Sequence, residues 1–131
     1  MAMQEQKRVS LQIDGMSIEA VHRDTILHVA HGLGIDIPTL CNHEGLPPSG
    51  ACRLCLVEVE KNGWTKYVTA CNYPVEDGIS ISTDSEQLRQ FRKMTLESLL
   101  ARCPEVPSIQ ALAQKHGVSE TRFAQSDDSC I

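Results

Sequence analysis

The chain has 131 residues, of which 22% are charged and 4% are aromatic. This length allows one modest hydrophobic core, so we expect one compact domain with an appendage. The 17 acidic residues outnumber the 12 basic ones, which argues against a nucleic-acid-binding surface, because such a surface needs clustered lysine and arginine. No apolar run is long enough to span a bilayer, and residues 1–10 lack a signal-peptide core, so we expect a cytoplasmic protein without membrane insertion.

The chain opens with a pattern typical of a β-hairpin. Residues 8–13 alternate apolar and polar side chains, and residues 16–20 continue the alternation after Asp14 and Gly15. An Asp-Gly pair between two alternating runs is a strong signal for a two-residue hairpin turn. We therefore predict two antiparallel strands here, with one face of the pair in the core.

A short helix is expected next, packed across the sheet. Asp24 or Thr25 can cap its N-terminus, and Gly32 with Gly34 can end it. Its predicted apolar face has three members: Ile26, Ala30 and Leu33.

Four of the six cysteines follow with the spacing C-x10-C-x2-C-x15-C, and they are Cys41, Cys52, Cys55 and Cys71. Four thiolates in this arrangement suit a metal or iron–sulfur centre better than a disulfide framework or a redox dithiol. The loop after Cys41 is rich in Gly, Pro and Ser, so its backbone can curl with N–H groups inward, toward a negatively charged centre. We interpret the four cysteines as ligands of a [2Fe-2S] cluster, for which Gly50 and Ala51 leave room.

Two other four-cysteine interpretations stay open at this point. Structural zinc sites usually use two C-x2-C knuckles, and only one is present, between Cys52 and Cys55. A thioredoxin-like dithiol would place the same pair at the start of a helix. The residues at 56–60 alternate like a strand instead.

Further strands are predicted after these cysteines. A strand from Leu56 turns back at Asn62-Gly63 into residues 64–69, and residues 79–82 supply a closing strand. Two hairpins, one helix and a closing strand indicate an α+β fold compatible with a β-grasp, although the strand order does not follow from the pattern.

Residues 85–118 are expected to be helical. Residues 83–86 read Thr-Asp-Ser-Glu, a capping box for a long helix that Pro104 stops. Ser108 can cap another helix that Gly117 ends. The apolar stripe of the long helix must be covered by the domain or by a partner, and we favour partial exposure to a partner. Its members are Leu88, Phe91, Leu96, Leu99 and Leu100.

The string CNHEGLPPSGACRLCLVEVE, with the fourth cysteine in VTACNYPVEDG, resembles one family of [2Fe-2S] domains. They are the ferredoxin-like domains of the large iron–sulfur subunit of NADH dehydrogenase, of iron-only hydrogenases, of NAD-linked hydrogenase diaphorases and of NAD-linked formate dehydrogenases. The resemblance implies a β-grasp domain at 8–84. The residue pattern adds a helical extension at 85–118 and a polar tail at 119–131. Cys130 in that tail looks like the start of a missing [4Fe-4S] region, or is a free thiol.

The resemblance also implies a function. Cys41 and Cys52 would hold one iron, and Cys55 and Cys71 the other. The chain would carry single electrons between flavin- or iron–sulfur-containing subunits of an NAD(P)-linked oxidoreductase. We expect no catalytic activity from it alone, because it has neither a G-x-G-x-x-G motif nor a P-loop. The alternative is a zinc-stabilised module that docks a partner through its C-terminal helices.

Other candidate residues have weaker support. Arg53 would stabilise the reduced cluster, steer an acidic partner, or simply be a solvated arginine. Cys103 is expected to be a small apolar residue at a helix end, and His43 a loop residue beside Cys41. His28 and His31 have a spacing that can bind a metal on a helix, but we favour a surface role.

Overall fold

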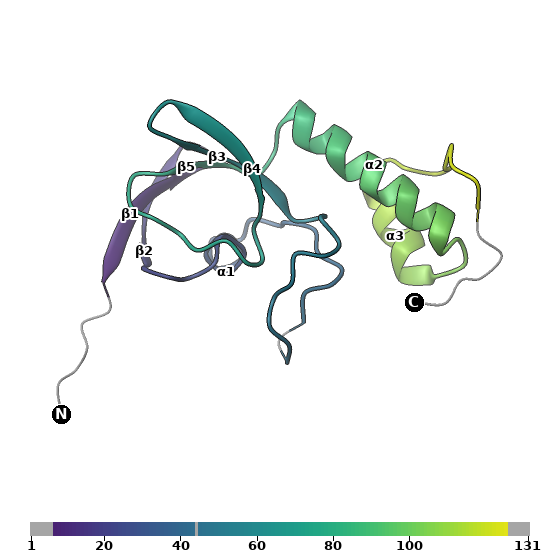
Figure 1. The fold of residues 1–131 in the computed structure, drawn as a ribbon, viewed down its shortest axis with the longest axis horizontal. Helices are drawn as coiled ribbons and strands as arrows, with labels where there is room; N and C mark the ends of the chain where they lie inside the picture. The colour runs from purple at the N-terminus through teal and green to yellow at the C-terminus, as the bar shows by residue number, and fades with distance from the viewer. Residues whose placement is uncertain (1–6, 44, 126–131) are drawn as a thin grey trace. The chain divides into compact units, whose positions relative to one another are not determined.

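The computed structural model describes residues 7–43 and 45–125, and these form the strands and helices labelled in Figure 1. In chain order the elements are β1 (Arg8–Ile13), β2 (Met16–Val21), α1 (Ile26–Gly32), β3 (Leu56–Lys61), β4 (Trp64–Thr69), β5 (Ser80–Ser82), α2 (Glu86–Arg102) and α3 (Pro107–Lys115). The chain divides into two compact units, Met1–Asp84 and Ser85–Ile131, and each is described by itself below.

Both predicted hairpins are present in the first unit. β1 and β2 pair antiparallel up to Ile13 and Met16, and β3 and β4 pair up to Lys61 and Trp64. The two residues of each turn have positive φ, which is the conformation that a two-residue hairpin turn of type I′ requires. They are Asp14 (51°), Gly15 (83°), Asn62 (52°) and Gly63 (82°).

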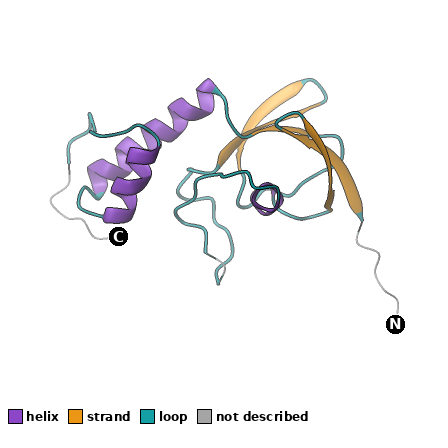
Figure 2. Cartoon of the chain, turned by 180° about the vertical axis from the view of Figure 1, so that it is seen from behind, coloured by secondary structure: helices purple, strands orange, loops and turns teal. Residues whose placement is uncertain are grey.

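The five strands form one mixed sheet in the order β2-β1-β5-β3-β4. The closing strand β5 lies in the middle, parallel to β1 and antiparallel to β3. Figure 2 shows this sheet curving around α1, which is seen end-on. The predicted α+β class is confirmed, and the arrangement is consistent with a β-grasp.

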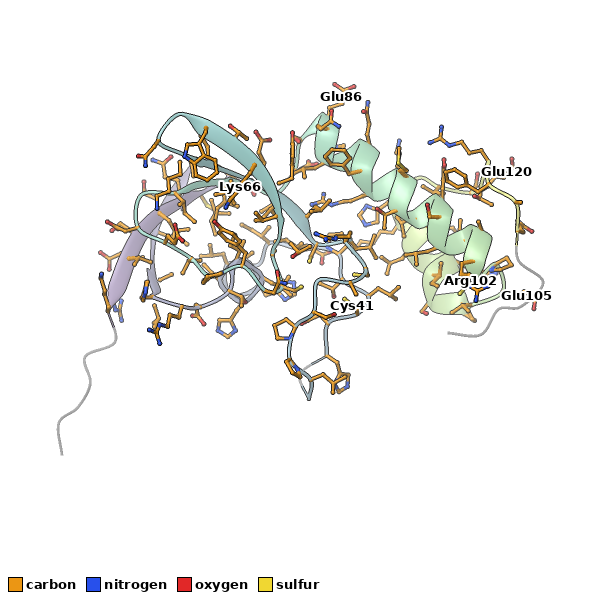
Figure 3. The ribbon with its side chains drawn as sticks, viewed as in Figure 1. Cys41, Lys66, Glu86, Arg102, Glu105 and Glu120 are labelled. Carbon is orange, nitrogen blue, oxygen red and sulfur yellow. The ribbon has the colours of Figure 1, made fainter. Side chains whose placement is uncertain are left out.

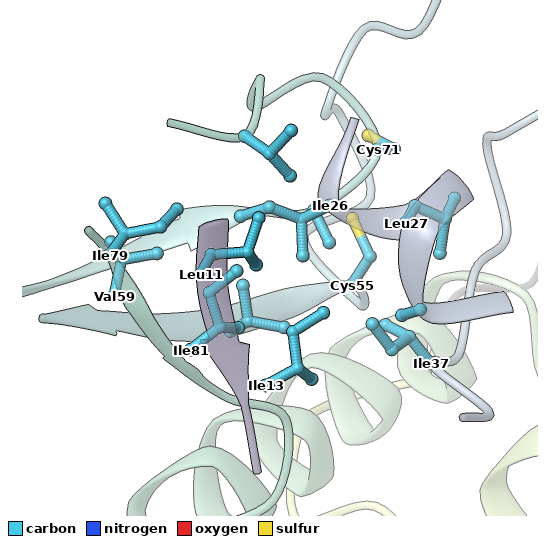
Figure 4. Close-up of a cluster of buried hydrophobic side chains, with 14 of the residues drawn as sticks. Leu11, Ile13, Ile26, Leu27, Ile37, Cys55, Val59, Cys71, Ile79 and Ile81 are labelled. Atoms are coloured by element: carbon cyan, nitrogen blue, oxygen red, sulfur yellow. The ribbon is translucent and has the colours of Figure 1, made fainter. Parts of the chain in front are cut away.

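Aliphatic side chains from the sheet and from α1 form the core of this unit. Every second residue of β1 is buried, as the alternating pattern predicts. Helix α1 contributes Ile26, Leu27 and Ala30 (Figure 4). The prediction for Leu33 was wrong, because its side chain is 42% exposed. The helix ends at Gly32 and the chain turns at Gly34 (φ 78°), so the apolar face stops one turn earlier than expected.

One predicted helix cap is confirmed and another is corrected. Thr25 caps α1, and its hydroxyl oxygen accepts from the His28 N–H at 3.2 Å. The cap of α2 is Ser85, whose oxygen accepts from the Leu88 N–H, and not the first residue of the predicted capping box. Thr83 is unavailable for that task, because its N–H and hydroxyl both donate to the Asp14 carboxylate.

The second unit consists of α2 and α3, which pack against each other. The predicted cap of the second of these helices, Ser108, was two positions late, since α3 begins at Pro107 after Val106 and has no side-chain cap. Proline suits this first position because its missing N–H has no helical partner there. On α2 the predicted apolar residues are buried or half-buried, while Met94 is 52% exposed.

A search of the described residues found no helix that is both long and apolar enough to cross a membrane.

Asp14→Ala tests the link between the first hairpin turn and the end of the sheet. The substitution leaves the N–H and the hydroxyl of Thr83 without their acceptor, and Thr83 is only 6% exposed. We expect the free energy of unfolding to fall by about 1–3 kcal/mol, the usual cost of stranding buried polar groups.

Urea unfolding measures this difference, with Asp14→Asn as the matched control that keeps an acceptor and tolerates positive φ. A loss below about 0.5 kcal/mol, as for an ordinary surface position, would show that the link contributes nothing.

Candidate metal centre

The β3–β4 hairpin brings two of the predicted cysteines to the same end of the sheet. Cys55 directly precedes β3, and Cys71 follows β4 by two residues. The ladder pairs Leu56 with Thr69, and the Ala70 N–H donates to the Cys55 carbonyl oxygen at 3.0 Å. Because the hairpin register fixes this end, the two thiols are adjacent. Their residues are 1% and 3% exposed and lie beside Ile26 and Leu27 of α1 (Figure 4).

Helix α1 holds the segment that carries Cys71. The first N–H groups of a helix have no partner within the helix. Here the Ile26 N–H donates to the Tyr73 carbonyl at 3.0 Å, and the Leu27 N–H donates to the Ala70 carbonyl at 2.9 Å. The start of α1 is therefore fixed to the residues on both sides of Cys71.

The other two cysteines lie on the loop between α1 and β3, where Figure 3 labels Cys41. Both Cys41 and Cys52 are half-buried. The Cys52 N–H donates to Cys41 Sγ at 3.5 Å, and the Ser49 hydroxyl donates to the same sulfur at 3.8 Å. This loop thus turns an amide and a hydroxyl toward a thiol, as its Gly/Pro/Ser content suggested.

The thiols meet in two pairs. The Cys52 N–H donates to Cys41 Sγ, and the Cys71 thiol lies close enough to Cys55 to help raise its pKa. Cys52 also lies close enough to Cys55 to raise the pKa of the Cys55 thiol. The structure therefore places the four predicted cysteines in one part of the first unit, as the pairs Cys41–Cys52 and Cys55–Cys71. That they bind iron stays a prediction.

The two pairs differ in electrostatics. Burial opposes ionisation of the Cys41 thiol, but hydrogen bonds from Cys52, Ser49 and the Ala51 backbone together hold its pKa below the usual value. Burial, followed by the neighbouring thiol of Cys71, raises the pKa of Cys55 to about 12. The Cys41 thiol thus ionises more readily than an ordinary thiol, whereas Cys55 must lose a proton when a cation arrives.

The residues present fit a two-iron cluster. Such a cluster needs four thiolates, and its negative charge is stabilised by hydrogen bonds to sulfur. Four sulfur donors and at least two such hydrogen bonds are available at this site. Within residues 7–43 and 45–125, no three histidine, cysteine or acidic side chains form a ready site for one metal ion.

The weaker candidates lie apart from the four thiols or in the loop itself. Exposed His43 accepts the Gly45 N–H at its Nδ1, 3.0 Å away, and so acts as a loop residue. Arg53 is exposed and has φ 61°, a strained conformation between two cysteines. Cys103 is 4% exposed at the end of α2, in keeping with an apolar role. Cys130 lies outside the described residues.

Sequence reasoning missed two residues beside the thiols. Thr69 is buried at the end of β4, and its hydroxyl donates to the side-chain carbonyl of Asn72. A methyl group at Gly50 would meet this pair at 2.9–3.0 Å. No local pattern marks Thr69 or Asn72, because their contact with the loop depends on the fold.

Sequence comparison identifies relatives of known kind. A family described as "2Fe-2S iron-sulfur cluster binding domain" matches residues 6–86, more than half of the chain. The NADPH-Fe(3+) oxidoreductase subunit alpha of Geobacter sulfurreducens is 48% identical over 96 residues, which are 73% of this chain and 11% of that protein. The NADH-ubiquinone oxidoreductase 75 kDa subunit of Reclinomonas americana is 42% identical over 96 residues, again 73% of this chain and 14% of that protein.

Structure comparison gives the same kind of neighbour. A crystal structure of NAD+-reducing [NiFe]-hydrogenase in the H2-reduced state matches with a TM-score of 0.80 and 30% identity. The match covers 94% of this chain and 55% of that chain. The chain therefore spans only a small part of the two relatives compared by sequence, and about half of this neighbour.

The pKa of Cys55 predicts how the cluster-free protein responds to alkali. A thiol in the unfolded chain ionises near pH 9, whereas folded Cys55 keeps its proton until about pH 12. Between these values the folded state binds more protons, so stability is full below pH 9 and falls as the pH rises. We expect the free energy of unfolding to drop by at most about 1.4 kcal/mol per pH unit from this group.

Urea unfolding of the cluster-free chain from pH 8 to 11 measures the slope, and Cys55→Ser supplies the comparison, since the substitution removes this thiol and leaves the lysines and tyrosines in place. Equal slopes for the two proteins would contradict the assignment.

Proposed function

The chain belongs to the family of 2Fe-2S iron–sulfur cluster binding domains, and from this membership we propose that it acts as a one-electron carrier inside a larger oxidoreductase. The resemblance predicted from the cysteine strings is thereby confirmed, and so is the [2Fe-2S] cofactor. The observation that carries the proposal is the meeting of four thiols in two pairs, within the segment that the family covers.

We propose Cys41 and Cys52 as the ligands of one iron, and Cys55 and Cys71 as the ligands of the other. The Cys52 N–H on Cys41 Sγ and the Cys71 thiol beside Cys55 support this assignment. The zinc-stabilised docking module is not favoured, because the family is described by a two-iron cluster.

The protein's own residues would shape the site in two ways. The bound cluster would supply reversible one-electron chemistry. The Cys52 N–H and the Ser49 hydroxyl stabilise negative charge on Cys41 Sγ. The residues around Cys55 and Cys71 exclude water, since both cysteines belong to the apolar core. A partner's redox group can come nearest at the half-buried thiols of Cys41 and Cys52.

The relatives suggest the kind of complex. Their names describe subunits of NADPH- or NADH-linked oxidoreductases, and the structural neighbour is an NAD+-reducing hydrogenase. We propose that this chain exchanges electrons with flavin- or iron–sulfur-containing subunits of such a complex and has no catalytic activity alone. A cytoplasmic location would keep its free thiols reduced for iron.

We also propose the boundaries of three parts of the chain. Residues 8–84 would form the cluster domain, residues 85–118 a helical extension and residues 119–131 a tail. The exposed Met94 on α2 is compatible with contact between the extension and a neighbouring subunit.

Reductive titration tests the carrier function and its ligands together. Anaerobically prepared protein should contain two irons and two sulfides per chain, take up one electron, and then give an EPR signal from the reduced cluster. Alanine at any of the four cysteines should abolish most of the iron content, because a cluster with three protein ligands is released easily.

Cys103→Ala is the matched control for the substitutions at Cys55 and Cys71, since it removes a thiol from the second unit that is about as buried as theirs, and it should leave the iron content unchanged. Protein that takes up no electron, or a Cys71→Ala variant that keeps a full cluster, would contradict the proposal.

Ser49→Ala should lower the reduction potential. Its hydroxyl donates to Cys41 Sγ, and such a bond favours the more negative, reduced state. A net hydrogen bond of about 0.5–1.5 kcal/mol corresponds to about 20–60 mV in a one-electron couple.

Protein-film voltammetry measures this shift, and Ser17→Ala on exposed β2 is the control. A potential that does not change, or rises, would show that the hydroxyl leaves the charge of the cluster unaffected.

A further inference from the structure

We propose that Thr69 and Asn72 form a latch that positions the cysteine loop against Cys71 and so determines how firmly the cluster is held. This inference rests on the proposed function, because it assumes that the four cysteines are the ligands. Neither residue is a ligand itself; both are positioning residues that act through the backbone of the loop.

The loop touches this pair at one buried point. Gly50 is buried, whereas its neighbours Ser49 and Ala51 are exposed. An added Cβ at Gly50 would lie 2.9 Å from Thr69 Oγ1 and 3.0 Å from Asn72 Nδ2, distances too short for an ordinary contact. Gly50 also has φ +68°, which disfavours any side chain there. The loop backbone at Gly50 therefore packs directly against the side chains of Thr69 and Asn72.

A hydrogen bond between the two side chains fixes the surface that the loop meets. The Thr69 hydroxyl donates to Asn72 Oδ1, which orients the amide so that Nδ2 lies toward Gly50. Thr69 is only 6% exposed, so its hydroxyl depends on this partner. The Asn72 N–H also donates weakly to the Thr69 carbonyl, at 3.5 Å. The turn around Cys71 is thus stabilised by one side-chain and one backbone hydrogen bond between Thr69 and Asn72.

The position of the latch connects the two halves of the ligand set. Asn72 directly follows Cys71, and Gly50 precedes Cys52 by two residues. The contact therefore sets the separation between the loop thiols and the hairpin thiols. Loss of the Thr69 hydroxyl would free the Asn72 amide to rotate and let the loop move away from Cys71.

The test compares three variants with the loaded wild-type protein. Thr69→Val keeps the shape of the side chain but removes the hydroxyl, Thr69→Ser restores the hydroxyl, and Thr65→Val is the control at an exposed position of the same strand. The measurements are the rate at which an iron chelator bleaches the cluster and the EPR spectrum of the reduced protein.

We expect Thr69→Val to lose its cluster about tenfold faster than wild type, equivalent to about 1.4 kcal/mol, and to show shifted EPR g values. Thr69→Ser and Thr65→Val should both behave like wild type. Asn72→Ala, which removes the amide while leaving the strand intact, should reproduce the effect of Thr69→Val and guards against a folding defect at position 69.

Two outcomes would contradict the proposal. If wild type holds a two-iron cluster but Thr69→Val and Asn72→Ala release it no faster than Thr65→Val, the latch is refuted and the proposed function stands. If wild type holds no two-iron cluster, the proposed function fails, and the latch fails with it.

Discussion

Repulsion between four negative sulfurs is the constraint that a centre held by these cysteines would have to meet. A protein that holds four thiolates within a few ångströms must supply both rigidity and compensating charge. Rigidity comes from the β3–β4 hairpin, whose register places Cys55 next to Cys71. Compensation comes from the loop, where an amide and a hydroxyl donate to Cys41. Burial, and after it the neighbouring thiols, raises the pKa of Cys55, so the folded chain leaves this cost uncompensated.

Strands and helix α1 of the first unit together position the segments that carry these cysteines. Strand β5 lies between β1 and β3 and joins the two hairpins into one sheet. Helix α1 crosses that sheet and donates two of its first N–H groups to the segment around Cys71. The same helix contributes Ile26 and Leu27 to the core in which Cys55 and Cys71 are buried. The β3–β4 hairpin, helix α1 and the apolar core therefore fix Cys55 and Cys71, whereas Cys41 and Cys52 lie on a loop.

Local patterns were sufficient to predict most elements of this chain. Asp14-Gly15 and Asn62-Gly63 predicted both hairpin turns because few residues adopt positive φ at low cost. The cysteine spacing indicated a [2Fe-2S] domain, and the family match confirms this kind of domain. Leu33 was misassigned because helical periodicity does not show where a helix stops. The central position of β5 and the contact of Thr69 and Asn72 with Gly50 could not be predicted, because both join segments that are distant in sequence.

Native mass spectrometry of the anaerobically isolated chain measures the content of the site most directly. If the four thiols enclose a two-iron cluster, the folded protein should exceed its polypeptide mass by two irons and two sulfides, less the protons displaced from the cysteines. The excess should vanish together with the compact charge states when the protein is denatured. A folded species that carries a single zinc ion, or a bare chain under the same conditions, would contradict this account.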